Sequence, residues 1–221
     1  MGEAELNTQR QQLTIHAHLI TYGNAADAHL TEQIRDEIET LWNEPQALVV
    51  LKSVPLAVQF RITAQYWPDL DELEVYQNTN PRNNYFRIEE YAHGNISFVD
   101  GVGSNSGYFK LENLYKGSTT AAHEFGHTLG LDHPRIMDLR GHGTPGIMYP
   151  RGTLVDPHYQ YDPYVQAGLT GGTLHPMHRK VQPHDIQNLK LQKLRFRSGR
   201  AVVGAFTNVY HWDHAAQPFI T

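Results

Sequence analysis

Residues 118–133 read STTAAHEFGHTLGLDH, and the rest of the chain is best understood from this stretch. Thr119 and Thr120 are residue types that cap the start of a helix, and residues 121–129 favour its continuation. Gly130 suits the left-handed backbone conformation that ends a helix. The segment therefore predicts a short helix that begins at the threonines and ends at Gly130.

Three histidines and one glutamate in this stretch have the spacing of a metal site. His123 and His127 are four residues apart, so on a helix both imidazoles lie on one face and can bind one ion. Gly130 lets the chain reverse, which would return His133 as a third nitrogen ligand. Three protein ligands leave one coordination position free, and Glu124 lies about 100° around the helix beside it. The pattern predicts one catalytic Zn²⁺, with Glu124 as the general base that activates a water.

A second motif, Gly-Ile-Met-Tyr-Pro, follows at residues 146–150. Taken together, the two motifs resemble those of the metzincin clan of zinc endopeptidases. In that clan the long helical motif is followed by a tight turn, the Met-turn, whose methionine lies beneath the metal. Met148 matches this methionine. Within the clan, the residues around both motifs are most similar to the matrixins, whereas Pro134, directly after the third histidine, is similar to the serralysins.

The resemblance implies an α+β protein with a metzincin-like zincin fold. Its parts would be a twisted mixed five-stranded sheet, the active-site helix, the Met-turn and a C-terminal helix, followed by a short strand-like C-terminal extension. We expect a single metallopeptidase catalytic domain over residues 1–221, with an upper subdomain at about 10–133 and a lower subdomain at about 134–221.

The resemblance also implies where the substrate binds. An edge strand within residues 95–111 would pair with an extended peptide, which explains how many sequences can bind while side-chain pockets select among them. Tyr149, Pro150 and Arg151 follow the methionine and would line the pocket for the side chain after the cleaved bond. Gly152 stands where matrixins usually carry a tyrosine, so the shape of this pocket is left open.

No residue is assigned to stabilise the oxyanion of the reaction. Astacins and serralysins carry a tyrosine two residues after the methionine, but this position is Pro150 here. By position, Tyr159, Tyr161, Tyr164 and His178 in the following loop could reach the site, but packing within the loop is the preferred interpretation of these side chains.

Apolar periodicity predicts the remaining elements. The predicted strands are 13–22, 48–51, 56–66, 73–76, 85–91, 95–100, 107–111 and 201–210, and the predicted helices are 31–42 and 183–194. An acidic cluster within residues 69–74 lacks the Asp-x-Asp-x-Asp-Gly loop of a calcium site. A solvated turn is the preferred interpretation, and a structural Ca²⁺ has no support from the sequence.

Composition limits the partners and the compartment. The chain has 221 residues, a formal charge of −5 and a pI near 6.2, with no cysteine and no apolar run long enough to cross a bilayer. No basic stripe favours nucleic acid, and neither a disulfide nor a thiolate metal site can form. The polar first residues lack the apolar core of a signal peptide. We expect a bacterial protein that is secreted or exported, as a mature domain or a fragment of a larger chain.

The sequence therefore predicts a zinc metalloendopeptidase that acts on protein or peptide substrates. Two alternatives stay open: a non-catalytic zinc-containing module that binds peptides or proteins, and a protease domain that acts as a delivered toxin or effector. The oligomeric state is also open, with a monomer favoured.

Overall fold

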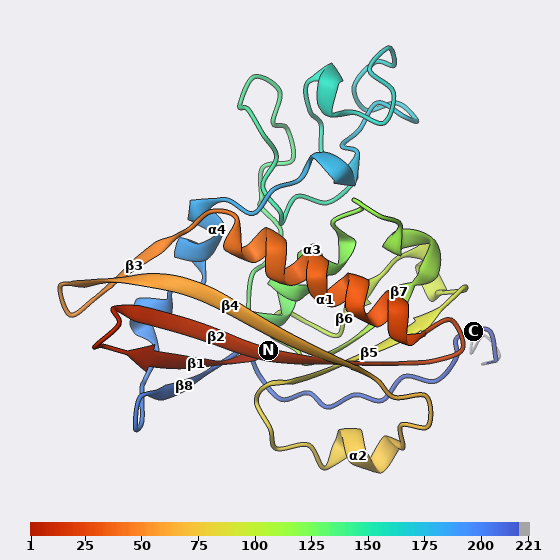
Figure 1. Cartoon of the computed structure of the whole chain (residues 1–221). Helices are drawn as coiled ribbons and strands as arrows, with labels where there is room; N and C mark the ends of the chain where they lie inside the picture. The colour runs from red at the N-terminus through yellow and green to blue at the C-terminus, as the bar shows by residue number, and fades with distance from the viewer. Residues whose placement is uncertain (217–221) are drawn as a thin grey trace.

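The computed structural model describes residues 1–216 and shows one twisted sheet with helices packed on it (Figure 1). The strands and helices, in chain order, are β1 (Gly2–Asn7), β2 (Gln12–Tyr22), α1 (Ala28–Asn43), β3 (Leu48–Leu51), β4 (Val54–Tyr66), α2 (Glu72–Tyr76), β5 (Asn83–Glu89), β6 (Phe98–Val99), β7 (Ser106–Lys110), α3 (Thr120–Thr128), α4 (Pro183–Asn188) and β8 (Arg200–Val203). None of these helices is both long and apolar enough to cross a membrane.

The sheet has eight strands, so the prediction of five was wrong. Its main path runs β3-β4-β2-β5-β7-β6, and β1 and β8 extend it beside β2. Strand β2 is parallel to β4 and β5, and β5 is parallel to β7. Strand β6 is antiparallel to β7 and forms one edge. The expected mixed sheet is therefore present, and the edge strand falls within residues 95–111.

Helix α1 lies along one face of this sheet (Figure 1). Asp27 caps its start by accepting a hydrogen bond from the Leu30 backbone N–H at 2.7 Å. Leu30, Ile34, Ile38 and Trp42 are buried at helical spacing, which confirms the helix expected at 31–42.

Residues 73–76 were predicted as a strand, but they belong to helix α2. Asp71 starts this helix by accepting a hydrogen bond from the Leu73 backbone N–H at 2.7 Å. A short run with few apolar residues fits both periodicities, and the cap decides between them here. Asp71, a member of the acidic cluster, is thus a helix cap.

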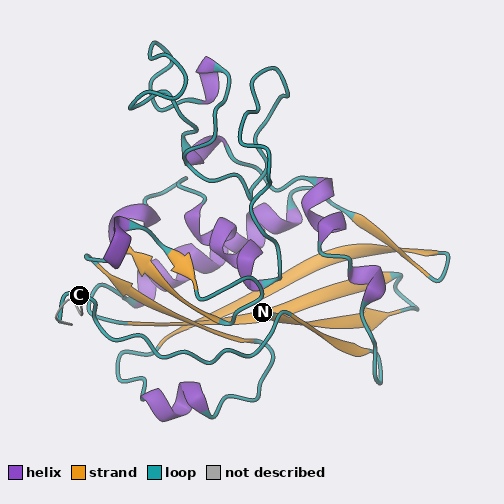
Figure 2. Ribbon diagram, turned by 180° about the vertical axis from the view of Figure 1, so that it is seen from behind, coloured by secondary structure: helices purple, strands orange, loops and turns teal. Residues whose placement is uncertain are grey.

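The chain between α3 and α4 is largely without regular secondary structure, and it rises beyond the helices on the side away from the sheet (Figures 1 and 2). Helix α4 is shorter than the helix predicted at 183–194, because Lys190 adopts a left-handed conformation with φ of 53°. The tail forms a strand only at 200–203, where it pairs with β1. The last part of the expected lower subdomain therefore joins the main sheet.

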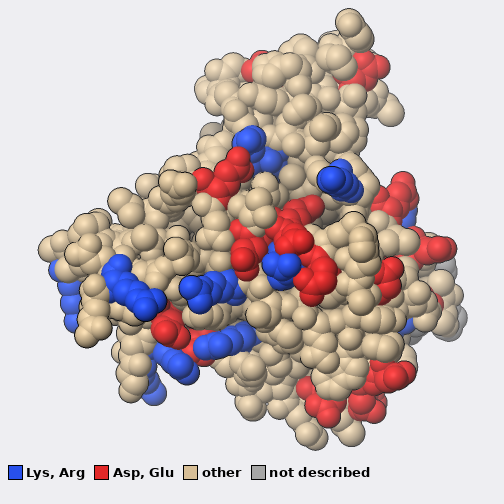
Figure 3. Space-filling view, in the orientation of Figure 1, with Lys and Arg blue, Asp and Glu red and all other residues tan. Residues whose placement is uncertain are grey.

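Charged side chains are unevenly spread over the face that Figure 3 shows. Acidic side chains gather over α1 and α2, and basic side chains gather over one end of the strands (Figure 3). This face therefore carries both signs of charge.

Candidate metal centre and active site

Helix α3 presents the motif and ends as the sequence predicts. Gly130 has a φ of +98°, in the left-handed region, and the Leu131 N–H donates to the Gly126 carbonyl at 3.0 Å. Such a bond across a left-handed residue satisfies a carbonyl that the helix end leaves free. The chain reverses at this point and carries His133 back toward the helix.

The start of α3 differs from the predicted threonine cap. Thr119 itself adopts a left-handed conformation, with a φ of 55°, and its side chain makes no cap hydrogen bond. Its hydroxyl donates to the Pro176 carbonyl at 2.8 Å and accepts from Arg179 Nε at 2.9 Å. The Thr120 N–H donates to the Ser118 hydroxyl at 3.3 Å. Thr119 is therefore occupied by tertiary partners, and this part of the prediction was wrong.

Helix α1 fixes the position of α3 through two polar contacts and one aromatic contact. The indole N–H of the buried Trp42 donates to the Ala122 carbonyl at 3.0 Å. Glu37 accepts from the Ala122 N–H at 3.2 Å, which places a carboxylate at the N-terminal end of α3, where the helix dipole favours it. The Trp42 ring also meets Phe125 edge-on at a centroid distance of 5.9 Å.

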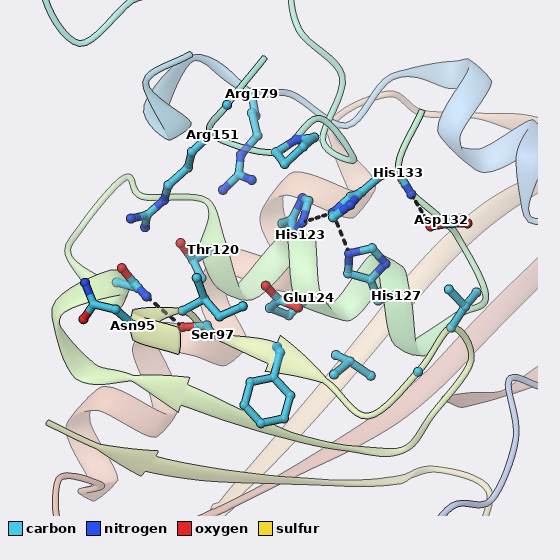
Figure 4. A pocket seen from close by; sticks show the side chains of 18 residues that line it. Asn95, Ser97, Thr120, His123, Glu124, His127, Asp132, His133, Arg151 and Arg179 are labelled. Carbon is cyan, nitrogen blue, oxygen red and sulfur yellow. Dashed lines mark hydrogen bonds between the residues drawn. The ribbon is translucent and has the colours of Figure 1, made fainter. Parts of the chain in front are cut away.

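The structure brings the three histidines of the motif together (Figure 4). Nε2 of His133 lies 3.1 Å from Nε2 of His123 and 3.1 Å from Nε2 of His127. Nδ1 of His123 lies 2.7 Å from the Ile147 carbonyl, and Nδ1 of His127 lies 2.8 Å from the Leu131 carbonyl. A carbonyl only accepts, so each Nδ1 carries the proton and each Nε2 presents a lone pair.

The donor set fits a zinc ion. Burial lowers the pKa of His123 well below its ordinary value, and it also lowers the pKa values of His127 and His133, which keeps the imidazoles neutral as metal ligands. Zn–N bonds of about 2.0–2.1 Å in a tetrahedron separate the ligand nitrogens by about 3.4 Å, and the two separations of 3.1 Å from His133 are close to that value. Within residues 1–216 no other group of three such side chains meets this way.

The predicted Met-turn packs against helix α3. Met148 is 3% exposed, and its side chain packs so close to α3 that a Cβ atom at Gly126 would lie 2.3 Å from the methionine sulfur. The neighbouring Ile147 supplies the carbonyl that holds the His123 ring. The turn thus contributes a backbone acceptor as well as an apolar base.

Glu124 is the acid of the site, and its side chain lines the same pocket as the histidines (Figure 4). No hydrogen bond to its carboxylate is found within residues 1–216, which leaves the oxygens directed at the pocket. Burial raises the pKa of Glu124 to about 8, and the charges of Arg179 and Arg151 oppose that rise. A carboxyl group with a raised pKa beside a metal-ligand cluster is suited to accept and return a proton.

The pocket has a volume of about 480 Å³ and lies between the edge strand and the segment that follows the Met-turn. Residues 95–99, which include β6, form one wall, and Pro150, Arg151 and Gly152 form another. Of the predicted pocket residues, Pro150 and Arg151 line this space, whereas Tyr149 does not. Tyr149 instead contributes its carbonyl, which accepts from Arg179 at 3.3 Å.

Comparison with known proteins agrees with the site. No family model matches the chain. A segment of 97 residues is 38% identical to serralysin G from Dickeya chrysanthemi, which covers 42% of this chain and 20% of that protein. This partial match supports the resemblance of the chain to the metzincin clan. This chain spans about a fifth of the length of serralysin G. The closer similarity to matrixins stays a prediction.

Among solved structures, the chain is similar to archaemetzincin from Methanopyrus kandleri. That likeness has a TM-score of 0.41 and 12% sequence identity, and it covers 80% of this chain and 95% of the other.

The pocket contains two residues that the sequence pattern did not reveal. Arg179 is 3% exposed and lines the pocket from an irregular segment without periodicity. Thr120 also lines it, and its buried hydroxyl has no hydrogen-bond partner within residues 1–216. None of the tyrosines weighed as oxyanion donors lies there, and Tyr164 is 96% exposed. Thr120 lies four residues before Glu124 and so on the same helix face, and this spacing is the one sequence signal that could have placed it in the pocket.

Proposed function

We propose that this chain is a zinc-dependent endopeptidase that hydrolyses peptide bonds of extended protein substrates. The observation that carries the proposal is the meeting of three imidazole Nε2 atoms beside the free carboxylate of Glu124, in a pocket bordered by an edge strand. The partial identity to serralysin G supports it.

Each residue of the site has a separate task. Zn²⁺ held by the three histidines would act as a Lewis acid toward the peptide carbonyl and the attacking water, and its charge would favour ionised Glu124. The carbonyls of Ile147 and Leu131 hold two of the rings, so these rings keep their orientation and tautomer. Glu124 takes the proton of the attacking water and then passes it to the leaving amine.

Strand β6 supplies the surface on which the substrate extends. It pairs with β7 on one side only, so its other side is the edge of the sheet and borders the pocket. An extended peptide can add to such an edge through backbone hydrogen bonds, which align it without reading its sequence. The cleaved bond is thereby presented to Glu124 and the histidines.

The test compares the zinc-loaded parent with Glu124→Gln, which keeps the shape of the side chain but cannot accept the proton. We expect zinc content by mass spectrometry to be unchanged and casein hydrolysis to fall by about 10²–10⁴-fold. Glu90→Gln, at an exposed position, is the matched control and should hydrolyse casein like the parent. Activity that survives in Glu124→Gln refutes the assigned base.

The same assay separates the proposal from the non-catalytic alternative. A parent protein that binds zinc and peptides but cleaves no casein, with or without a chelator, is a binding module. Export of the chain, and a role as a delivered toxin or effector, stay predictions.

A further inference from the structure

Two arginines line the active-site pocket, and neither has an acidic partner. Within residues 1–216 no carboxylate oxygen lies within 4.0 Å of a guanidinium nitrogen of Arg151 or Arg179. Arg151 makes no hydrogen bond to the protein there. Arg179 donates only to uncharged oxygens, which are the Thr119 hydroxyl at 2.9 Å, the Ser118 carbonyl at 3.1 Å and the Tyr149 carbonyl at 3.3 Å.

The absence of an ion pair to any described residue is unusual for Arg179, because this arginine is buried. It is 3% exposed, and a buried charge without a directly paired counter-charge is destabilising. Burial lowers the pKa of Arg179 to about 10, so it still carries its charge at neutral pH. A guanidinium has five N–H groups, and the three bonds to the protein leave two for a ligand.

Thr120 adds a third polar group at the same place. Its hydroxyl is buried and has no partner within residues 1–216, which is rare for a polar atom in a folded protein. In Figure 4 the side chains of Arg151 and Arg179 both extend toward Thr120. Asp132 lies at the opposite end of the pocket, beyond His133 (Figure 4), so its charge does not neutralise the arginines.

We infer that Arg151, Arg179 and Thr120, here called the arginine pocket, bind the carboxylate side chain of a substrate Asp or Glu next to the cleaved bond. This inference rests on the proposed function. Carboxylates match a guanidinium in shape and charge, and they form paired charge-assisted hydrogen bonds with it. The Thr120 hydroxyl would donate a further bond to the same group.

The arrangement also explains which substrates are disfavoured. An apolar side chain in the arginine pocket would remove water from two guanidinium groups without replacing the lost hydrogen bonds. A Lys or Arg side chain would add a third positive charge. Glu124, one helical turn from Thr120, and Glu37 both attract the charge of Arg179, but neither lies within 4.0 Å of its guanidinium nitrogens.

The test uses matched peptides that carry Glu, Gln or Leu at either residue flanking the cleaved bond. For the zinc-loaded parent we expect kcat/KM to favour Glu over Gln and Leu by at least tenfold at one of the two positions. Arg151→Glu should invert the preference toward a Lys peptide, which a merely structural effect would not do. Arg61→Gln, at an exposed position on β4, is the control and should keep the parent's ratio.

A binding measurement separates this inference from the proposed function. Fluorescence anisotropy with the same peptides is measured on zinc-loaded Glu124→Gln, which cannot use the assigned base. Tighter binding of the Glu peptide supports the arginine pocket even if the parent cleaves nothing, in which case only the peptidase proposal fails. Equal affinity for the Glu, Gln and Leu peptides at both positions overturns the arginine pocket.

Discussion

The contact between the Met-turn and α3 can be tested with a single methyl group. A Cβ added at Gly126 would lie 2.3 Å from the Met148 sulfur and 3.2 Å from Trp42 Cζ2. Ordinary contacts are about 3.5–4.0 Å, so the buried methionine would have to move by more than about 1 Å. Overpacking of this kind costs about 1–3 kcal/mol. Alanine gains about 0.8–1.0 kcal/mol over glycine in helix propensity, so we expect Gly126→Ala to lose about 0–2 kcal/mol of stability.

The assay is urea unfolding of the metal-free protein, because bound zinc would add its own stabilisation. Met148→Ala provides the control background, since it removes the side chain that the new methyl group meets. In that background Gly126→Ala should become neutral or stabilising, and the difference is the coupling between the two sites. Gly126→Ala that stabilises the parent by about 1 kcal/mol would show that Met148 does not pack against the helix there.

Three further predictions concern the scaffold and the metal. Trp42→Phe keeps an aromatic ring but loses the N–H bond to Ala122, and urea unfolding should show a loss of about 1–3 kcal/mol. Zinc added at a hundredfold excess over its Kd should stabilise the parent by about 2.7 kcal/mol in thermal unfolding, and His133→Ala should lose most of this gain. Burial lowers the pKa of His214 from 6.5 to about 4, so between these pH values only the unfolded chain binds a proton there. Stability should therefore fall as pH falls through this window, and less steeply in His214→Phe; equal slopes would contradict the assignment.

The local sequence pattern was sufficient to predict a helix or strand where one face of that element is buried. Strand β2 and helix α1 follow their apolar periodicity, although the helix was predicted to begin at residue 31 and begins at Ala28. Strand β1 has no such signal, because it carries Glu3 and Glu5 and depends on pairing with both β2 and β8. The local pattern therefore missed β1, because pairing with a segment far along the chain is not encoded in it.

The residues of the site also fall into those that the local sequence predicts and those that it does not. The spacing of His123, His127 and His133 is local, since the helix period and one glycine fix it. The groups that complete the site are backbone carbonyls and an arginine from an irregular segment. No residue type predicts that Ile147 offers its carbonyl to His123, or that Arg179 uses the hydroxyl of Thr119.

Helix α3 has nine residues, and isolated helices shorter than about 12–15 residues are marginal in water. Its position is therefore set from outside, by Trp42 and Glu37 on α1, by Arg179 at its start and by Met148 beneath it. Trp42 and Glu37 are not among the residues that line the active-site pocket. Substituting either of them should nevertheless lower both the zinc affinity and the stability of the protein. Arg151 makes no hydrogen bond within residues 1–216, so Arg151→Gln should change the choice of peptide and leave the unfolding midpoint unchanged. If zinc affinity instead survives the loss of Trp42 intact, the histidine segment holds its own geometry and α1 is not its support.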